Sequence, residues 1–180
     1  MAKDDDAMLV RACLSGDASA FQTLVGKYGG PLYNVAYRIT HSREDAADAT
    51  QAAFVKAYEK LGTFDFRHRF FSWIYRIAVN EALDLAGRSG RERALGAVAV
   101  RSADDPERDC AEAERCDHLE RALRELEPGE RALVVLKHLQ GLSYAEIGEV
   151  VDLPEKTVKS RLFSARHRLR GILIEKGWSP

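Results

Sequence analysis

Residues 141–170 read GLSYAEIGEVVDLPEKTVKSRLFSARHRLR and carry the clearest structural signal in the chain. Ser143 followed by Glu146 three residues later is the pattern of a capping box, which begins a helix. A turn is expected at residues 152–153, and Pro154 suits the first turn of the next helix. Two short helices joined by a tight turn, with the second helix basic, predict a helix-turn-helix motif.

The second of these helices has two unlike faces. One face is apolar at a helical period and is expected to face a core; its members are Val158, Leu162, Ala165 and Leu169. The opposite stripe is basic with one aromatic residue in its middle, and consists of Lys156, Lys159, Phe163, Arg166 and Arg170. Arginine and lysine read guanine edges in the major groove, and an aromatic ring can contact thymine methyl groups. The stripe favours DNA recognition, and the alternative is a solvated basic face with Phe163 packed on a neighbouring helix.

A second cluster lies at residues 64–88, where aromatic residues alternate with arginines. Six aromatics fall within twelve positions, namely Phe64, Phe66, Phe70, Phe71, Trp73 and Tyr75. Most of them are expected to pack in a helical core, whereas the other face offers Arg69, Trp73, Arg76, Asn80 and Asp84. Aromatics among cations suit the unstacked bases of single-stranded DNA. On spacing alone, an aromatic-rich core with a charged rim explains the cluster equally well.

The rest of the chain also predicts helices, and strands have little support because alternating apolar runs with hairpin signals are missing. The expected fold is therefore all-α, with helices at 7–14, 18–28, 32–40, 42–61, 70–87, 112–126 and 129–139. Residues 29–31 (Gly-Gly-Pro) are expected to interrupt the chain. The helix at 42–61 is expected to bury a stripe of Ala47, Thr50, Phe54, Ala57, Tyr58 and Leu61.

A polar, acidic stretch follows residue 87 and predicts a flexible linker between two small domains. We expect a first helical domain at 1–90, an acidic linker at 91–111 and a second domain at 112–180 that contains the helix-turn-helix. The 180 residues include 27 basic and 28 acidic side chains, which excludes a protein that coats nucleic acid along its whole surface. Positive charge is local instead, with a net charge of +5 at residues 153–176 and −3 at 91–118. Local basic stripes of this kind are compatible with DNA binding.

Motifs for catalysis and for metal binding are missing from the sequence. There is no glycine-rich phosphate loop, HExxH motif or nucleophile elbow, so we expect no enzymatic activity and no cofactor. Cys13, Cys110 and Cys116 cannot form a closed disulfide framework, and the sequence predicts no metal site. No secretory signal and no apolar run of about 20 residues is present, so we expect a cytoplasmic protein without membrane contact of its own.

Three stretches in this order resemble a bacterial RNA polymerase sigma factor of the extracytoplasmic-function (group IV) type. They are DAADATQ at 45–51, FSWIYRIAVN at 71–80, and LSYAEIG at 142–148 continued by TVKSRLFSAR at 157–166. The resemblance implies two helical domains and no catalysis by the chain itself. It implies binding to core RNA polymerase, through the β′ clamp helices and the β subunit, and to promoter DNA. It also implies control by an anti-sigma factor.

The resemblance also assigns roles to residues. The helix at 43–60 would dock on the β′ clamp helices, with Asp45, Asp48 and Gln51 at the motif positions. The loop at 63–69 and the following helix would read and open the −10 element, with Phe64, Arg67, Arg69, Trp73, Arg76 and Asn80 as candidates. The helix at 155–168 would read the −35 element, with Lys156, Lys159, Ser160, Arg161, Phe163, Ser164 and Arg166 as candidates.

Two other functions remain open from the residues alone. A helix-turn-helix repressor or activator would use residues 1–90 as a sensor or dimerisation domain and would bind spaced half-sites as a dimer. A nucleic-acid-processing metalloprotein would use Asp45 and Asp48 as metal ligands, although such a pair is more often a solvated face or a docking patch.

Overall fold

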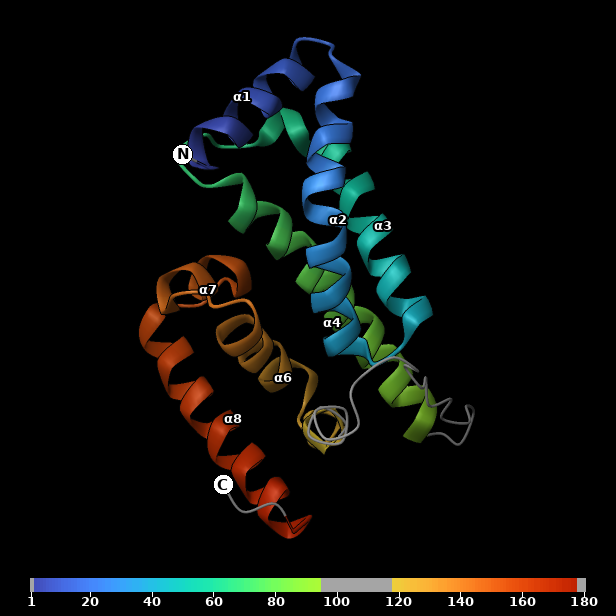
Figure 1. Cartoon of the computed structure of the whole chain (residues 1–180), viewed down its shortest axis with the longest axis vertical. Helices are drawn as coiled ribbons and strands as arrows, with labels where there is room; N and C mark the ends of the chain where they lie inside the picture. Colours follow the sequence, from blue (N-terminus) through green and yellow to red (C-terminus); the bar gives the residue numbers. More distant parts are fainter. Residues whose placement is uncertain (1, 95–117, 178–180) are drawn as a thin grey trace, which may run out of the picture.

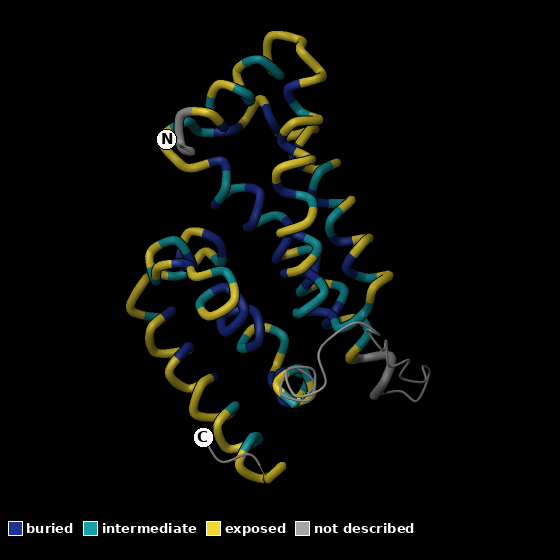
Figure 2. The backbone as a smooth tube through the Cα atoms, viewed as in Figure 1, coloured by how far each residue is buried: buried dark blue, intermediate teal, exposed yellow. Residues whose placement is uncertain are grey.

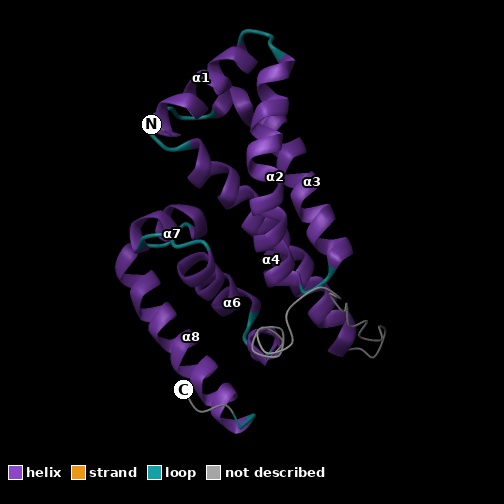
Figure 3. Cartoon of the chain, in the orientation of Figure 1, coloured by secondary structure: helices purple, strands orange, loops and turns teal. Residues whose placement is uncertain are grey.

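The computed structural model describes residues 2–94 and 118–177, and these residues form helices, turns and loops without any strand (Figures 1 and 3). The all-α prediction is confirmed. The first half contains α1 (Ala2–Leu14), α2 (Ala18–Thr40), α3 (Arg43–Lys60), the short 3-10 turn η1 (Leu61–Thr63) and α4 (Phe70–Ala94). The second half contains helical residues 118–124, then α6 (Pro128–Val134), the π-helical turn η2 (Val135–Leu139), α7 (Tyr144–Val151) and α8 (Glu155–Glu175).

The first body is built around α2, α3 and α4, which pack on one another with α1 across one end (Figure 1). The core side of α3 consists entirely of alanines, namely Ala46, Ala49, Ala53 and Ala57, all fully buried. Small side chains let helix axes approach closely, so α3 lies against both α2 and α4. The predicted α3 stripe is partly confirmed, since Ala57 and Leu61 are buried, but Ala47 is exposed and Tyr58 is 57% exposed.

Helix α2 is continuous where the sequence predicted an interruption. It runs through Gly29, Gly30 and Pro31 to Thr40. Proline removes one backbone donor and disfavours a helix interior. However, Leu24 and Leu32 on either side of the interruption are both fully buried. Burial of one continuous apolar stripe therefore outweighs the local cost of the Gly-Gly-Pro sequence.

Helix α4 is longer than predicted, because it continues past Gly87 and Gly90 to Ala94. The helix thus extends four residues beyond the expected end of the first domain at residue 90. Ala86 is buried and Ser89 lies 3.4 Å from the Asp45 carboxylate of α3, so packing holds this part of the helix. Of the predicted linker at 91–111, residues 95–111 lie outside the described residues.

The second body contains the predicted helix-turn-helix. Ser143 caps α7 in a capping box, in which its hydroxyl accepts from the Glu146 amide at 3.2 Å and the Glu146 carboxylate accepts from the Ser143 amide at 2.9 Å. Asp152 adopts the left-handed conformation, with φ of 54°, and ends α7. Pro154 then precedes the first residue of α8, so the predicted turn and caps are confirmed.

Gly148 allows this turn to close tightly. A Cβ at this position would lie 2.7 Å from the Leu153 carbonyl oxygen, which belongs to the turn backbone and cannot swing aside. We expect Gly148→Ala to lower the free energy of unfolding by roughly 1–3 kcal/mol, measured by urea denaturation. Gly171→Ala on α8 is the matched control, because its Cβ would meet open space. There the higher helix propensity of alanine should raise stability by roughly 0.5–1 kcal/mol, and a similar loss at both positions would contradict a steric role for Gly148.

Candidate nucleic-acid and polymerase interfaces

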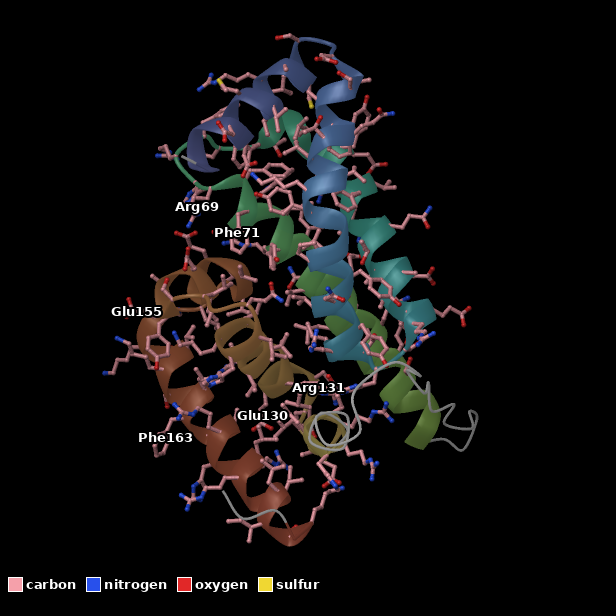
Figure 4. All side chains as sticks on the ribbon, in the orientation of Figure 1. Arg69, Phe71, Glu130, Arg131, Glu155 and Phe163 are labelled. Carbon is pink, nitrogen blue, oxygen red and sulfur yellow. The ribbon has the colours of Figure 1, made fainter. Side chains whose placement is uncertain are left out.

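The predicted DNA-reading stripe of α8 is exposed. Val158, Leu162 and Ala165 are buried and fix the rotation of the helix about its axis, and α8 is otherwise almost entirely exposed along its outer side (Figure 2). The seven predicted −35 residues are all exposed, namely Lys156, Lys159, Ser160, Arg161, Phe163, Ser164 and Arg166. Phe163 is 73% exposed and points away from the rest of the molecule (Figure 4), so the alternative in which it packs on a neighbouring helix is wrong.

Lys159 is held in place by an ion pair on its own helix and by an aromatic ring on α7. Its Nζ lies 2.6 Å from the Glu155 carboxylate and 5.4 Å from the centre of the Tyr144 ring on α7. Lys137 approaches the same ring at 4.7 Å. The hydrogen bond that Lys159 donates to the Glu155 carboxylate raises the pKa of Lys159, so this residue stays a cation. Tyr144 lies 15 residues before Lys159 on another helix, and no spacing rule connects the two positions.

The predicted −10 residues of α4 lie along one side of the helix. Arg69 immediately precedes the first turn, Trp73 and Arg76 are half-buried, and Asn80 is exposed. Their spacings of four, three and four residues place them on a common face. Both arginines contact α7 of the second body. The face combines cations, an aromatic ring and an amide, which are the groups that bind unstacked bases and the phosphates between them.

The loop before α4 also contains the exposed Arg67 and the buried ring of Phe64. Arg67 forms an ion pair with Asp65, in which Nη2 and Oδ2 are 2.6 Å apart, and its hydrogen bonds lower the pKa of Asp65 to about 2. Phe64 is only 7% exposed, and its ring lies 5.1–5.8 Å from those of Phe66, Trp73 and Phe70. Phe64 therefore belongs to the core, and we leave it out of the proposed −10 surface.

The predicted polymerase-binding residues lie on the outer side of α3. Asp48 and Gln51 are exposed, and Asp45 is half-buried near Ser89. The same side continues into two apolar residues that the sequence prediction missed, Val55 at 51% exposure and Tyr58. An acidic end followed by exposed apolar side chains is typical of a protein-docking surface.

A metal centre receives no support from the described part of the chain. Among residues 2–94 and 118–177, no three or more His, Cys, Asp or Glu side chains are grouped so that they could hold a metal ion. Asp45 and Asp48 thus lack further ligands there, while Cys110 and Cys116 lie outside the described residues. Nor is any described helix long and apolar enough to cross a bilayer.

The second body has an apolar hollow of about 390 Å³ between residues 118–124, α6 and α8. Leucines and a valine form most of its lining, namely Leu119, Leu123, Val134, Leu139, Leu169 and Leu173. His138, Arg166 and Arg170 also border it. Burial lowers the pKa of His138, and the positive charge of Arg166 lowers it further. The positive charge at the edge of the hollow therefore comes from Arg166 and Arg170.

An exposed basic helix in one body and arginines with an aromatic ring on one face of the other are features typical of DNA-binding proteins. Comparison with known protein families identifies the family to which the two bodies belong. Residues 24–92 match the family model of sigma-70 region 2, and residues 117–169 match the model of sigma-70 region 4. These matches cover the two bodies described above.

Characterised relatives agree with these matches. The chain is 32% identical over 181 residues to the RNA polymerase sigma-H factor of Pseudomonas aeruginosa, covering 94% of each protein. It is 30% identical over 173 residues to the ECF RNA polymerase sigma factor SigW of Bacillus subtilis, covering 89% of this chain and 92% of the relative. The chain therefore belongs to the extracytoplasmic-function (ECF) sigma factors of RNA polymerase, a class of alternative sigma factors that act in transcription initiation. The resemblance seen in the sequence is confirmed.

Solved structures share the arrangement of the two bodies. The structure of CnrH in complex with the cytosolic domain of CnrY matches with a TM-score of 0.73 at 28% identity, covering 95% of this chain and 98% of CnrH. The sigma factor RpoE of Bartonella quintana, solved in complex with the anti-sigma factor NepR, matches with a TM-score of 0.68 at 24% identity and shows the same fold. Its match covers 85% of this chain and 96% of RpoE.

Proposed function

We propose that this ECF sigma factor divides promoter recognition between its two bodies. Helix α8 reads the −35 element in the major groove through Lys156, Lys159, Ser160, Arg161, Phe163, Ser164 and Arg166. Helix α4 and the loop before it read the −10 element through Arg67, Arg69, Trp73, Arg76 and Asn80. The observation that carries the proposal is the exposed stripe of α8, because cations around an exposed aromatic ring suit a DNA groove.

The polymerase contacts proposed on α3 lie away from both DNA surfaces. Asp45, Asp48 and Gln51 on α3 contact the β′ clamp helices, with Val55 and Tyr58 extending the same surface. The apolar hollow of the second body receives an apolar segment of the β subunit. In this division, the domain that binds polymerase and the −10 element ends with α4 at residue 94, a linker follows up to residue 111, and residues 112–180 form the −35 domain.

An anti-sigma factor and a cytoplasmic location complete the proposal. CnrH was solved with the cytosolic domain of CnrY, and the Bartonella quintana factor was solved with an anti-sigma factor. A partner of this kind would hold the chain in the cytoplasm, where RNA polymerase works, until a signal releases it. The chain itself catalyses no reaction and needs no cofactor, because the polymerase supplies the active site.

Run-off transcription from a library of promoters tests this function. We expect transcripts only when core RNA polymerase and the chain are both present, and only from promoters with two separated elements. Sequencing the active promoters would define both elements together. Tight binding of the chain alone to a symmetric operator, without polymerase, would contradict the proposal and favour a dimeric repressor.

Arg166 offers a test of the −35 surface. We expect Arg166→Ala to lower transcription about tenfold at promoters with a matched −35 element, since one lost base contact is worth roughly 1–3 kcal/mol. Arg168→Ala is the matched control, because Arg168 lies on the same helix but pairs with Glu130 at 3.2 Å instead of joining the stripe. An equal loss at every promoter would show that Arg166 contacts phosphate and does not read sequence.

A further inference from the structure

The basic reading surface of α8 contains one acidic side chain at its beginning. Glu155 is the first residue of the helix, and the only other acid of α8 is Glu175 at its last position. Figure 4 shows Glu155 at the end of α8 that adjoins the turn from α7, where the residue is exposed. Lys159 and Phe163 follow at intervals of four residues, so all three lie on one side of the helix. In a complex with DNA, the carboxylate would therefore enter the groove with the cations.

Glu155 and Lys159 form a pair of one hydrogen-bond acceptor and one donor. Oε1 of Glu155 lies 2.6 Å from Nζ of Lys159, and about half of each side chain is exposed, 49% and 54%. An exposed ion pair stabilises a helix only slightly. DNA phosphates repel a carboxylate, so an acid on this side weakens DNA binding unless a donor of the DNA meets it. The donors in a major groove are the amino groups of cytosine and adenine.

A ring on the neighbouring helix also holds Lys159. Its Nζ lies 5.4 Å from the centre of the Tyr144 ring, at the beginning of α7. Lys137 lies 4.7 Å from the same centre and donates to the Leu142 carbonyl at 3.0 Å. The ammonium group of Lys159 therefore contacts both the ring and the Glu155 carboxylate. A side chain that is held before binding loses less conformational entropy when it binds.

The spacing of the two charged atoms matches the edge of a single base pair. Guanine offers O6 and N7 as acceptors, and cytosine offers its N4 amino group as a donor. O6 and N4 are hydrogen-bonded to each other in the pair, so they lie about 2.9 Å apart. An ammonium group on guanine and a carboxylate on cytosine, 2.6 Å apart, can thus contact both bases together. In an A·T pair the donor lies between two acceptors, which brings a carboxylate close to O4 of thymine.

We propose, on the basis of the function proposed above, that Glu155 and Lys159 together read one G·C base pair of the −35 element. Tyr144 acts as a positioning residue that directs Lys159 toward the guanine. The first residues of the second helix contact base edges in helix-turn-helix proteins, and Glu155 and Lys159 occupy the first two turns of α8. Glu155 was not among the residues that the sequence predicted for −35 recognition. Its carboxylate accepts from cytosine and rejects bases that present an acceptor at that place.

Run-off transcription with core polymerase tests this reading in the full chain. Each position of the −35 element would carry each of the four base pairs in turn. At one position we expect the parent chain to favour G·C about tenfold over the other three pairs. Because the preference is a ratio measured for one protein, a general loss of activity cancels from it.

Glu155→Gln is the decisive variant. Glutamine keeps the length of the side chain but can donate as well as accept, so it no longer rejects an acceptor. We expect the preference for G·C at this position to fall below about threefold, with the preferences at the other positions unchanged. Glu175→Gln makes the same change at the other end of α8 and should keep the preferences of the parent. Equal preferences in both variants would overturn the role of Glu155.

Lys159→Met tests whether the two residues read the same base pair. Methionine removes the ammonium group and keeps an unbranched apolar side chain, so the preference for G·C should fall at the position that Glu155→Gln affects. The double variant should lose little more than the more affected single variant, because the two contacts depend on each other. If the two single variants affected different positions, each residue would read its own base pair, and the paired reading would be wrong.

Two variants of Tyr144 test its positioning role. Tyr144→Phe keeps the ring and should keep the preference of the parent. Tyr144→Leu removes the ring and should lower the preference for G·C about two- to fivefold at the same position, the range of an exposed cation–π contact. Equal behaviour of the two variants would contradict the positioning role.

The same experiment separates this inference from the proposed function. An active parent chain that favours G·C at no −35 position would overturn the paired reading alone. Inactivity of the parent chain at every promoter would overturn the proposed function and the paired reading with it.

Discussion

Replacement of Arg131 by methionine should lower the free energy of unfolding by roughly 3–5 kcal/mol, the size expected when one partner of a buried charged network is removed. Arg131 is 7% exposed. Its guanidinium donates to the backbone carbonyls of Leu123, Arg124 and Leu126, at 2.8–3.0 Å, and also to that of Ile39. The Leu123 and Arg124 carbonyls lie in the last turn of helical residues 118–124, and the Leu126 carbonyl lies two residues beyond it, so none of them has the amide partner of a continuing α-helix.

Methionine keeps the apolar volume of this side chain and removes all of its donors. The carbonyls would then be buried without these partners, and each unsatisfied group costs about 1–3 kcal/mol. The measurement is urea denaturation followed by circular dichroism. Hydrogen exchange would locate the loss, which should be largest in residues 118–124 and α6.

Two control variants sharpen this prediction. Arg168→Met makes the same change at an exposed arginine of α8 that forms one surface ion pair, and it should cost less than about 1 kcal/mol. Arg131→Lys keeps the charge but replaces the planar guanidinium group with a single ammonium group, which makes fewer hydrogen bonds. The free energy of unfolding of this variant should therefore lie between those of the parent and Arg131→Met. Equal losses for Arg131→Met and Arg168→Met would show that the buried network does not stabilise the second body.

The helix-turn-helix could be predicted from the sequence because its signals are local. Ser143 and Glu146 are three residues apart, and the α8 stripe repeats within a single helix. Each of these patterns specifies its structure without reference to the rest of the chain. For this reason the turn, the caps and the exposed face of α8 all agree with the prediction.

Features set by packing between distant segments could not be predicted in the same way. Alanine is small and contributes little to a hydrophobic sequence pattern. The prediction for α3 therefore placed larger residues such as Tyr58 in the core, where the structure has alanines. Gly-Gly-Pro usually breaks a helix, yet burial on both sides of it keeps α2 intact. The contacts of Arg69 and Arg76 with α7 join residues more than 70 positions apart, and no local rule would find them.

The structure pairs some of the opposite charges of the two bodies with each other. Acidic groups of the second body lie against cations of the first, as Glu146 does with Arg69 and Glu120 with Arg38. Charges that are paired within the molecule attract DNA less than exposed charges do. The α8 stripe stays exposed, whereas Arg38 and Arg69 are paired with carboxylates of the second body.

Asp48→Lys should weaken binding of the chain to core RNA polymerase about a hundredfold, which corresponds to about 2.7 kcal/mol. Asp48 is exposed on the outer side of α3, one turn before Gln51 and about two turns before Val55, the first of the two exposed apolar residues. In the proposed complex its carboxylate meets a basic surface of the β′ clamp helices. Lysine at this position both removes the attraction and places like charges together, and such a contact costs several kcal/mol.

The measurement is a titration of labelled chain with core polymerase, with circular dichroism to verify the fold. Because Asp48 is exposed on α3, the variant should melt at nearly the same temperature as the parent. Glu175→Lys makes the same charge change at an exposed position at the end of α8 and should leave the dissociation constant within about twofold, since it lies outside the proposed docking surface. Equal affinity of both variants would remove Asp48 from the polymerase interface. An equal loss for both would indicate attraction by total charge alone, without a contact at α3.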